Sequence, residues 1–220
     1  MALIETPELL HERDWKENKI DDSLLDNTGR FKALLKLIKK NNPKCIFDIG
    51  CGSGILGKKI KSWKSTITIH GCDISASALE RADQYLDKVW HIDLDQEDIP
   101  VDSGHYDIAV CSEVLEHIYD INHAIREINR ILKPKGIGLL TVPNMGYWRY
   151  RLDILKGELP IPIDDDRHIH FFNKISFEKR LMGNKLEIIS ISGYRINFPW
   201  LAKWKPSLFS DTLVFEILKK

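Results

Sequence analysis

The sequence lacks an excess of charge of either sign, and it lacks long apolar runs. Its 32 Lys and Arg residues balance its 32 Asp and Glu residues. A protein that coats nucleic acid needs a basic surface, so this balance argues against a nucleic-acid partner. The longest apolar runs fall far short of the ~20 residues that a transmembrane helix needs, so we expect no membrane span. The first five residues have no basic start before an apolar stretch, so no signal peptide is predicted.

Cysteine is scarce and scattered. The four cysteines are Cys45, Cys51, Cys72 and Cys111, and no two of them lie within five residues of each other. This spacing excludes the paired CxxC ligands that are typical of a zinc site. Three of the four lie in or beside apolar runs, so we predict buried, reduced thiols in a cytoplasmic protein.

The length and the order of apolar segments predict one α/β domain. A chain of 220 residues is long enough for one well-buried core and short for two. Short apolar runs predict strands at residues 45–49, 66–72, 89–92, 106–111 and 137–142. Amphipathic or capped segments predict helices at residues 54–63, 75–86 and 118–132, the last ended by Lys133-Pro134-Lys135-Gly136. Alternating strands and helices indicate a parallel sheet with helices on both faces.

The flanking segments complete the single domain of residues 1–220. Residues 1–43 predict a helical N-terminal lid, and residues 44–144 form the cofactor-binding core. Residues 145–173 are rich in proline and aromatic residues, which favours an ordered substrate lid rather than a disordered loop. Residues 174–220 predict a helix near 175–182 and strands at 186–192 and 212–218. The sequence leaves the oligomeric state open.

A glycine-rich turn follows the first predicted strand, with the sequence Asp48-Ile49-Gly50-Cys51-Gly52-Ser53-Gly54. Ligands of open α/β sheets bind at the carboxyl ends of strands, and glycines let a ligand approach the backbone there. A dinucleotide pattern G-x-G-x-x-G can be read from Gly52 to Gly57. A carboxylate at Asp48 would repel a pyrophosphate, however, and suits a cationic ligand such as S-adenosylmethionine (SAM). Asp73, after the second strand, is placed to accept hydrogen bonds from ribose hydroxyls.

The complete turn resembles motif I of the class I SAM-dependent methyltransferases. Further segments of this sequence resemble the same family in the same order: Tyr106 to His117, Arg130 to Gly136, Val142-Pro143-Asn144 and, more weakly, Arg167 to Asn173. The resemblance implies a Rossmann-like sheet of seven mostly parallel strands, with helices on both faces and the last strand antiparallel. It also implies that SAM is the cofactor.

The resemblance assigns cofactor contacts residue by residue. Gly50, Cys51, Gly52 and Gly54 would surround the amino-acid end of SAM, while Ile74 would lie against the adenine. An acid after the third strand would accept the adenine amine. Asp93 with Leu94 follows the apolar run directly, whereas Asp95 has the commoner spacing to Pro100; we favour Asp93 and keep Asp95 open. Ser112, at the end of the fourth strand, completes the predicted contacts.

The segment Glu113-Val114-Leu115-Glu116-His117 predicts chemistry beside the methyl group. If it begins a helix, Glu113, Glu116 and His117 share one face and could bind a divalent cation. The pattern resembles the ubiquinone-pathway O-methyltransferases and the small-RNA terminal 2′-O-methyltransferases. The second family implies a magnesium site completed by a downstream histidine, here His168 or His170. Such a metal would lower the pKa of a substrate hydroxyl.

Two other interpretations of Glu113, Glu116 and His117 remain open at this stage. His117 could act as a general base without a metal, or Glu116 and His117 could form a purely structural pair. Aromatic and arginine side chains in residues 1–30 and 143–173 favour an acceptor that is a small molecule or a sugar or glycan hydroxyl. The alternatives are a SAM-binding regulatory or scaffold protein without turnover and an NAD-dependent oxidoreductase.

Overall fold

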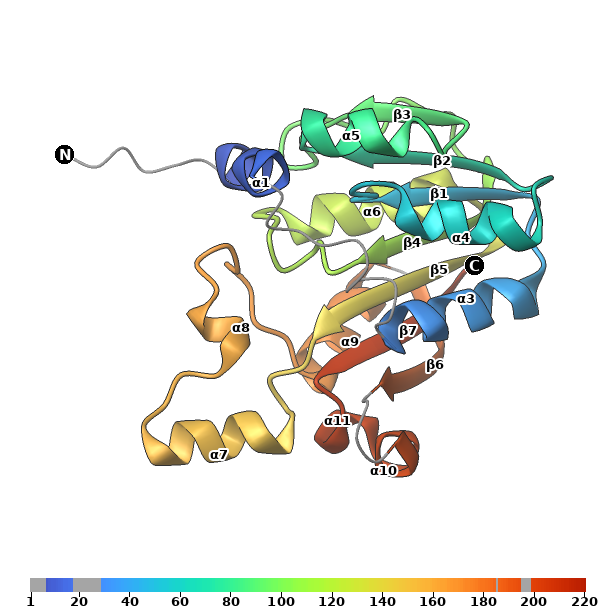
Figure 1. Ribbon diagram of the computed structural model, residues 1–220. Helices are drawn as coiled ribbons and strands as arrows, with labels where there is room; N and C mark the ends of the chain where they lie inside the picture. Colours follow the sequence, from blue (N-terminus) through green and yellow to red (C-terminus); the bar gives the residue numbers. More distant parts are fainter. Residues whose placement is uncertain (1–6, 18–28, 185, 195–198) are drawn as a thin grey trace.

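The computed structural model describes residues 7–17, 29–184, 186–194 and 199–220. Within them one seven-stranded sheet has the order β3-β2-β1-β4-β5-β7-β6 (Figure 1). Its strands are β1 (Cys45–Ile49), β2 (Thr68–Asp73), β3 (Lys88–His91), β4 (Tyr106–Ser112), β5 (Leu132–Pro143), β6 (Leu186–Tyr194) and β7 (Thr212–Lys219). The first five strands pair in parallel, and β7 runs antiparallel to both of its neighbours. The Rossmann-like fold with an antiparallel last strand is therefore confirmed.

Helices cover both faces of this sheet. The helices of the described residues are α1 (Pro7–Lys16), α3 (Gly29–Asn41), α4 (Ile55–Trp63), α5 (Ala76–Ala82), α6 (Ile121–Ile131), α7 (Trp148–Lys156), α8 (Ile161–Asp164), α9 (Lys174–Gly183), α10 (Pro199–Trp204) and α11 (Pro206–Phe209). Apolar residues of α3, α4 and α5 pack in one core cluster, and those of α6 and α9 pack in the other. Because β1 lies between these layers, all five of its residues are buried, as expected for a strand covered on both faces.

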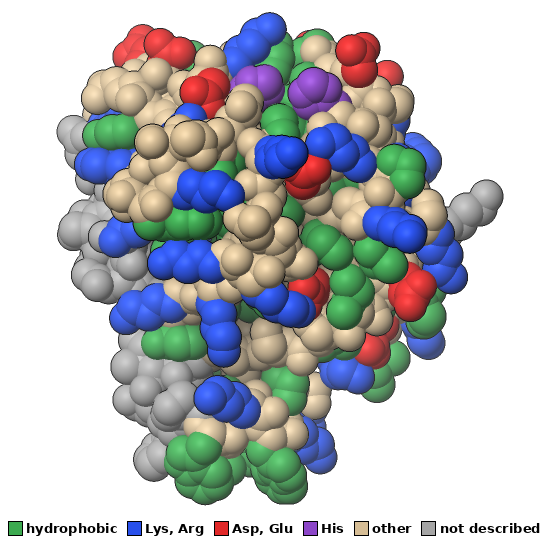
Figure 2. Space-filling model, turned by 90° about the vertical axis from the view of Figure 1, so that its right-hand side faces the viewer, with side chains coloured by type: hydrophobic (Ala, Val, Ile, Leu, Met, Phe, Trp, Pro, Cys, Tyr) green, Lys and Arg blue, Asp and Glu red, His purple; other side chains and the backbone are tan. Residues whose placement is uncertain are grey.

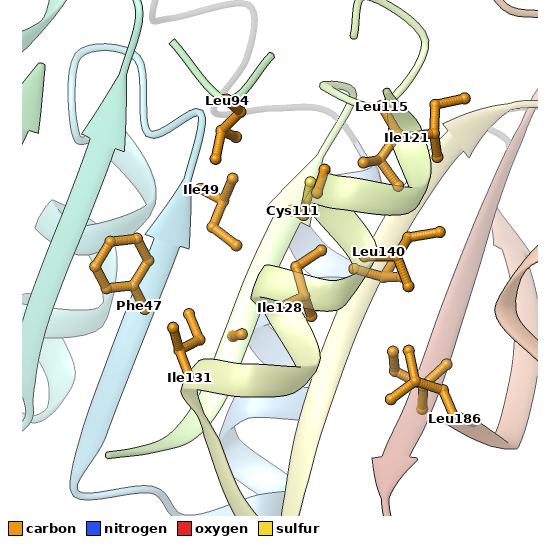
Figure 3. Packing of buried hydrophobic residues seen from close by; sticks show 14 of the residues in the cluster. Phe47, Ile49, Leu94, Cys111, Leu115, Ile121, Ile128, Ile131, Leu140 and Leu186 are labelled. Carbon is orange, nitrogen blue, oxygen red and sulfur yellow. The ribbon is translucent and has the colours of Figure 1, made fainter. Parts of the chain in front are cut away.

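Helix α6 illustrates how the sequence pattern produces the packing. Asp120 caps the helix by accepting a hydrogen bond from the His123 amide at 2.9 Å. Ile121, Ile128 and Ile131 recur at helical spacing and are fully buried against the sheet. Figure 3 shows this row of side chains facing those of β1, β4 and β5. The four cysteines are also buried and free.

Several predicted boundaries were wrong. Helix α6 begins at Ile121 rather than at residue 118, and α5 ends at Ala82 rather than at residue 86. The predicted turn at residues 133–136 is instead the start of β5. There the register with β4 shifts between the pairs Tyr106–Leu132 and Ile108–Ile137, and Lys135 adopts a φ of 64°. The bulge accommodates a proline that an uninterrupted ladder would not.

The segment predicted as a substrate lid carries helices α7 and α8. Figure 1 shows this segment extending from the end of β5 at the lower left, away from the sheet. Of the predicted N-terminal lid, α1 and α3 are described, and residues 1–6 and 18–28 lie outside the described residues.

Among the described residues, no helix has the length and apolar character needed to cross a bilayer.

Candidate functional site

A cavity of about 480 Å³ opens at the carboxyl ends of the parallel strands. Turns after β1, β2, β3 and β4 form its floor, and α1, α3 and the segment Asp165–His168 close over it. In Figure 1 this edge of the sheet lies on the left, beside α1. Except for Gly54, the residues that the sequence assigned to SAM and to catalysis all line this cavity, at the edge where open α/β sheets bind ligands.

The glycine-rich turn has the backbone that its glycines predict. Gly50, Gly52 and Gly54 have φ values of 67°, 51° and 75°, a left-handed region that residues with a Cβ atom rarely adopt. A Cβ on Gly54 would lie 2.9 Å from the Cα of Ala82, so this glycine also permits close packing against α5. The amides of Gly50 and Cys51 both donate to the Cys72 carbonyl, at 2.8 and 3.0 Å, which fixes the turn to the end of β2.

Asp48 lies on the floor of the cavity, and its side chain is almost completely buried, with 4% exposed. Burial, with a smaller contribution from the negative charge of Asp73, raises its pKa from 3.8 to about 7. A cationic ligand would favour the ionised form again. The position is therefore suited to the positive charges of SAM.

Asp73 holds the turn and faces the cavity. Its carboxylate accepts hydrogen bonds from the amides of Gly52 at 2.8 Å and Ser75 at 2.9 Å. Burial raises its pKa, and these hydrogen bonds oppose the shift. Ile74 lines the cavity next to it.

Asp93, Leu94 and Asp95 all line the cavity. Asp93 accepts hydrogen bonds within its own turn, from the Asp95 amide at 2.9 Å and from the Gln96 side chain at 2.6 Å. Asp95 accepts the Asp120 amide at 2.9 Å, which ties this turn to the start of α6. Both acids are in reach of a ligand in the cavity, so the choice between them for adenine stays a prediction.

The segment after β4 is a turn, and the helix considered for Glu113 is not formed. Glu113 adopts a φ of 56°, which is rare for a residue with a side chain and is common where function constrains the backbone. Its carboxylate pairs with Arg30 at 3.1 Å and accepts the Thr141 hydroxyl at 2.9 Å. Ser112 bonds to the same threonine at 3.0 Å. The structure therefore places Glu113 and Ser112 on the cavity wall, held by α3 and β5.

Glu116 is the most unusual charged residue of the site. Its side chain is 1% exposed, and neither carboxylate oxygen has a hydrogen-bond partner among the described residues. Burial, with the negative charge of Glu113, raises its pKa well above the usual range. A buried carboxylate without partners is costly and is explained most simply by a proton or a cation that belongs there.

His117 and His168 complete a group with Glu116. One ligand atom of each residue lies within 4.8 Å of the others. We call these three residues the catalytic cluster, after the role that the sequence predicts for Glu116 and His117. The Nδ1 atoms of His117 and His168 contact the carbonyls of Arg167 at 2.9 Å and Pro162 at 2.8 Å. Because a carbonyl only accepts, each Nδ1 carries the hydrogen, and each Nε2 presents a lone pair. Burial lowers the pKa of His117 to about 4, which keeps the ring neutral.

The structure distinguishes the two downstream histidines. His168 belongs to the catalytic cluster, whereas the His170 ring stacks on Phe172 at 6.2 Å. The carbonyl of Glu116 accepts the amides of Ile169 and His170 at 2.9 and 3.0 Å, which holds the loop against the turn. Glu113, considered as a metal ligand from the sequence, is not brought into the cluster.

Helix α1 contributes His11 and Trp15, two residues of the predicted N-terminal lid that the sequence indicates for the acceptor side, and both line the cavity. His11 packs edge-on against His117 at 5.0 Å, and Trp15 lies against the Gly52 backbone. Glu12 fixes the helix by accepting hydrogen bonds from the hydroxyls of Ser75 and Ser77, each at 2.6 Å. Their only sequence signal is an aromatic and charged N-terminal helix.

Of the aromatic and arginine side chains that residues 143–173 offered for the acceptor, most lie outside the cavity. Arg167 lines the cavity and pairs with Asp14 at 3.0 Å and Asp165 at 2.8 Å. The other aromatic and arginine side chains considered for the acceptor are not among the residues that line the cavity: Tyr147, Trp148, Arg149, Tyr150 and Arg151.

Comparison with known proteins defines the class. Residues 23–191, most of the chain, match the family described as "Methyltransferase domain". The chain therefore belongs to this methyltransferase family, and its Rossmann-like fold is that of the SAM-dependent members.

Curated relatives carry a more particular name. The chain is 25% identical over 180 residues to the ubiquinone biosynthesis O-methyltransferase of Rickettsia conorii, covering 79% of this chain and 61% of that protein. It is 26% identical over 207 residues to the protein of the same name from Rickettsia prowazekii, covering 88% and 80%. The chain thus spans about three fifths of the length of the first of these relatives.

Solved structures agree on the fold. A magnesium protoporphyrin IX methyltransferase from Synechocystis with bound S-adenosylhomocysteine has a TM-score of 0.65 at 17% identity, covering 90% of this chain and 86% of that one. A SAM-dependent methyltransferase from Mesorhizobium loti has a TM-score of 0.58 at 16% identity, covering 83% and 96%.

Proposed function

We propose that this protein is an O-methyltransferase that transfers the methyl group of SAM to a hydroxyl of a small molecule. The observation that carries the proposal is the catalytic cluster. A buried carboxylate without partners lies beside two imidazole rings in the cavity that also contains the glycine-rich turn. Such a set suits removal of a proton from an oxygen acceptor. The O-methyltransferase names of the relatives described above support the same chemistry, and these names do not support the sugar or glycan acceptor considered from the sequence.

SAM would be held by the cofactor half of the cavity. Gly50, Cys51, Gly52 and Gly54 would surround its amino-acid end, with the Asp48 carboxylate opposite the positive charge. Asp73 would accept the ribose hydroxyls, Ile74 and Leu94 would contact the adenine, and Asp93 or Asp95 would accept the adenine amine. SAM supplies a methyl group on a positive sulfur that departs with the electrons of the broken carbon–sulfur bond.

The protein's own task is to position the acceptor and take its proton. The Nε2 lone pair of His117 is available to accept a hydroxyl proton because Nδ1 is committed to the Arg167 carbonyl. Helix α1 covers the site and excludes water, which strengthens electrostatic interactions within it. Placing the acceptor oxygen in line with the methyl supplies much of the remaining rate enhancement.

The catalytic cluster also fits a divalent cation. Two imidazoles and one carboxylate are ordinary ligands for such an ion, and a cation would satisfy the otherwise unpartnered oxygens of Glu116. A bound cation would lower the pKa of an acceptor hydroxyl that touches it. Two nitrogen ligands favour a transition metal over the magnesium considered from the sequence, since magnesium prefers oxygen.

The test combines labelled SAM with a panel of phenols, aliphatic alcohols, amines and thiols. We expect label on hydroxyl compounds and a loss of about 100-fold or more in turnover for Glu116→Gln, with SAM affinity within about threefold of wild type. Label only on amines or thiols, or full turnover of Glu116→Gln, would contradict the proposal. SAM binding without transfer to any acceptor would favour the regulatory alternative.

The cation is tested separately by metal content and by EDTA. If the ion belongs to the cluster, wild type should contain close to one transition metal per chain, and His168→Asn should lose it. Full activity after EDTA treatment would exclude a role for the cation in catalysis, and His117 alone would then be the proposed base.

A further inference from the structure

Large hydrophobic side chains are exposed mainly on two segments that lie outside the cavity. The structure records fourteen such side chains, and eight of them lie within residues 148–161 or on α10. We call these eight the docking face: Trp148, Leu152, Ile154, Leu155, Leu159, Ile161, Trp200 and Trp204. Leu155, Ile161 and Trp204 expose 81%, 78% and 73% of their surface. Single exposed apolar residues are ordinary, but a concentration of them marks an interaction surface.

Helix α7 turns its apolar stripe outward. None of its residues is buried, in contrast to the six buried residues of α6. Its two least exposed residues, Tyr150 and Asp153, lie three apart and mark the side toward the protein, where Tyr150 packs on Tyr147 at 5.0 Å. Trp148, Leu152 and Leu155 follow at i, i+4 and i+7 and form a stripe on another side.

Helix α10 presents two further tryptophans at the same end of the molecule. Trp200 and Trp204 lie four residues apart and are 64% and 73% exposed. The Asn144 side chain, just before α7, donates to the carbonyls of Ser207 and Ser210 at 3.2 and 2.7 Å, which ties α7 to the chain after α10. Figure 1 places α7 and α10 at the lower end. Figure 2, which faces the side away from α7, shows hydrophobic side chains at the lower end below Lys and Arg side chains.

Basic side chains border helices α7 and α10 of the docking face, whereas the segment after α7 carries the exposed acids Glu158 and Asp164. Arg151 lies on one side of the α7 stripe, and Arg149 and Lys156 lie on the other. Lys203 and Lys205 accompany the tryptophans of α10. The structure records no ion pair between any of these five cations and the described residues, and Asp153 is the one acid within α7.

We propose that the docking face binds the surface of an anionic lipid bilayer, with α7 lying in the plane of the interface. An outward stripe of tryptophan and leucine with arginine and lysine on both sides is the composition of an interfacial helix. Tryptophan favours the boundary between headgroups and acyl chains, and the basic side chains would contact anionic headgroups. A second copy of this chain fits less well, because Arg149, Arg151 and Lys156 would face their own counterparts.

The docking face is continuous with the segment Asp165–His168, which closes over the cavity. The chain runs from α8 directly into Asp165, Arg167 and His168, which line the cavity. A bilayer bound at α7 and α8 would therefore lie next to the acceptor side of the site. The inference rests on the surface alone and holds whichever acceptor is methylated.

The test is cosedimentation of the full chain with vesicles of phosphatidylcholine alone or mixed with phosphatidylglycerol, without SAM or acceptor. We expect binding to the mixed vesicles that salt weakens. The double variant Leu152→Glu with Leu155→Glu should lose about tenfold or more of this binding. The matched control is Ile175→Glu with Ile189→Glu, whose side chains are 64% and 46% exposed outside the docking face, and it should bind like wild type.

Three outcomes would overturn the proposal. They are failure of wild type to bind the mixed vesicles, an equal loss in the control variant, and a dimer in light scattering that the α7 variant converts to a monomer. The last would assign the docking face to a second copy of the chain. Thermal unfolding followed by circular dichroism verifies that both double variants are folded.

Discussion

At the cofactor end of the cavity, the Asp73 carboxylate accepts two backbone amides, whereas at the catalytic end the Glu116 carboxylate accepts no hydrogen bond from the described residues. The cofactor half of the cavity is formed mainly by the turns at the ends of β1 and β2. The catalytic half is assembled from α1, the turn after β4 and the loop at residues 165–170. This contrast indicates that the two halves differ in function. In the cofactor half the Asp73 carboxylate has hydrogen-bond partners before a ligand binds, whereas in the catalytic half the Glu116 carboxylate would gain its partners from bound reactants.

The largest expected effect separates the two halves directly. His117→Asn should lower kcat by about 100- to 1,000-fold, because the lone pair that accepts the proton is lost. The affinity for SAM should stay within about threefold of wild type, since the cofactor half is unchanged. Steady-state kinetics and calorimetry measure the two quantities.

The exposed His105 provides the control for that variant, because it lies away from the cavity. His105→Asn should have wild-type kinetics. A His117→Asn enzyme that keeps its turnover would remove this residue from the catalytic role.

The next effect concerns the turn of the cofactor half. Gly54→Ala should lower the free energy of unfolding by about 2–4 kcal/mol, because the new Cβ meets Ala82 at a φ that alanine disfavours. Gly157→Ala is the matched control: its φ is 81°, but nothing lies within 4 Å of the added Cβ. It should cost about 1 kcal/mol. Equal losses in urea unfolding would show that close packing against α5 is unimportant.

Much of the cofactor half could be predicted because its information is local. Asp48, the glycines and Asp73 each follow a strand that its own apolar run identifies, and parallel strands bring their ends to one edge. The positive φ values at Gly50, Gly52 and Gly54 confirm what the glycines predict.

The catalytic half could be predicted only in part. The resemblance of the Glu113–His117 segment to two methyltransferase families indicated Glu116 and His117, but the helix considered for their shared face does not form. Glu113 instead adopts a backbone conformation that its residue type does not predict. The choice of His168 over His170 depends on the fold of the loop, and the position of His11 depends on the packing of α1. Contacts between distant segments leave no pattern in a single sequence.

A smaller effect is expected from the ribose position. Asp73→Asn should weaken SAM binding by about 10- to 100-fold, because charge-assisted hydrogen bonds to the ribose become weaker. Asp83→Asn, at the exposed end of α5, should bind SAM like wild type. Unchanged SAM affinity in the Asp73 variant would show that the ribose does not bind at this carboxylate.

The smallest effect is on stability and has a defined sign. Because burial raises the Asp48 pKa from 3.8 to about 7, the folded protein keeps a proton that the unfolded chain loses between these values. The free energy of unfolding therefore falls as pH rises across this window. Asp48→Asn cannot ionise, so near neutral pH it should be about 1–3 kcal/mol more stable than wild type while binding SAM more weakly.

Asp107 gives the opposite control. Burial acts to raise the pKa of Asp107, but Lys133 and the amides of Lys44 and Cys45 together outweigh it and lower the pKa. The stability that ionised Asp107 contributes is fully present above its pKa in the unfolded chain and is lost as pH falls through its lower pKa in the folded protein. Asp107→Asn should therefore destabilise the protein near neutral pH. Urea unfolding at several pH values measures how the free energy of unfolding depends on pH. Asp48→Asn should remove a decrease of this free energy with rising pH, and Asp107→Asn should remove an increase. The same change in both variants would rule out the buried-charge explanation for Asp48.

The most direct test is titration calorimetry of the wild-type protein with SAM, S-adenosylhomocysteine and NAD. The acid in front of the glycine turn and the acids that follow it predict that SAM and S-adenosylhomocysteine bind at one site and that NAD does not. Binding of NAD without binding of SAM would contradict the assignment of the cavity.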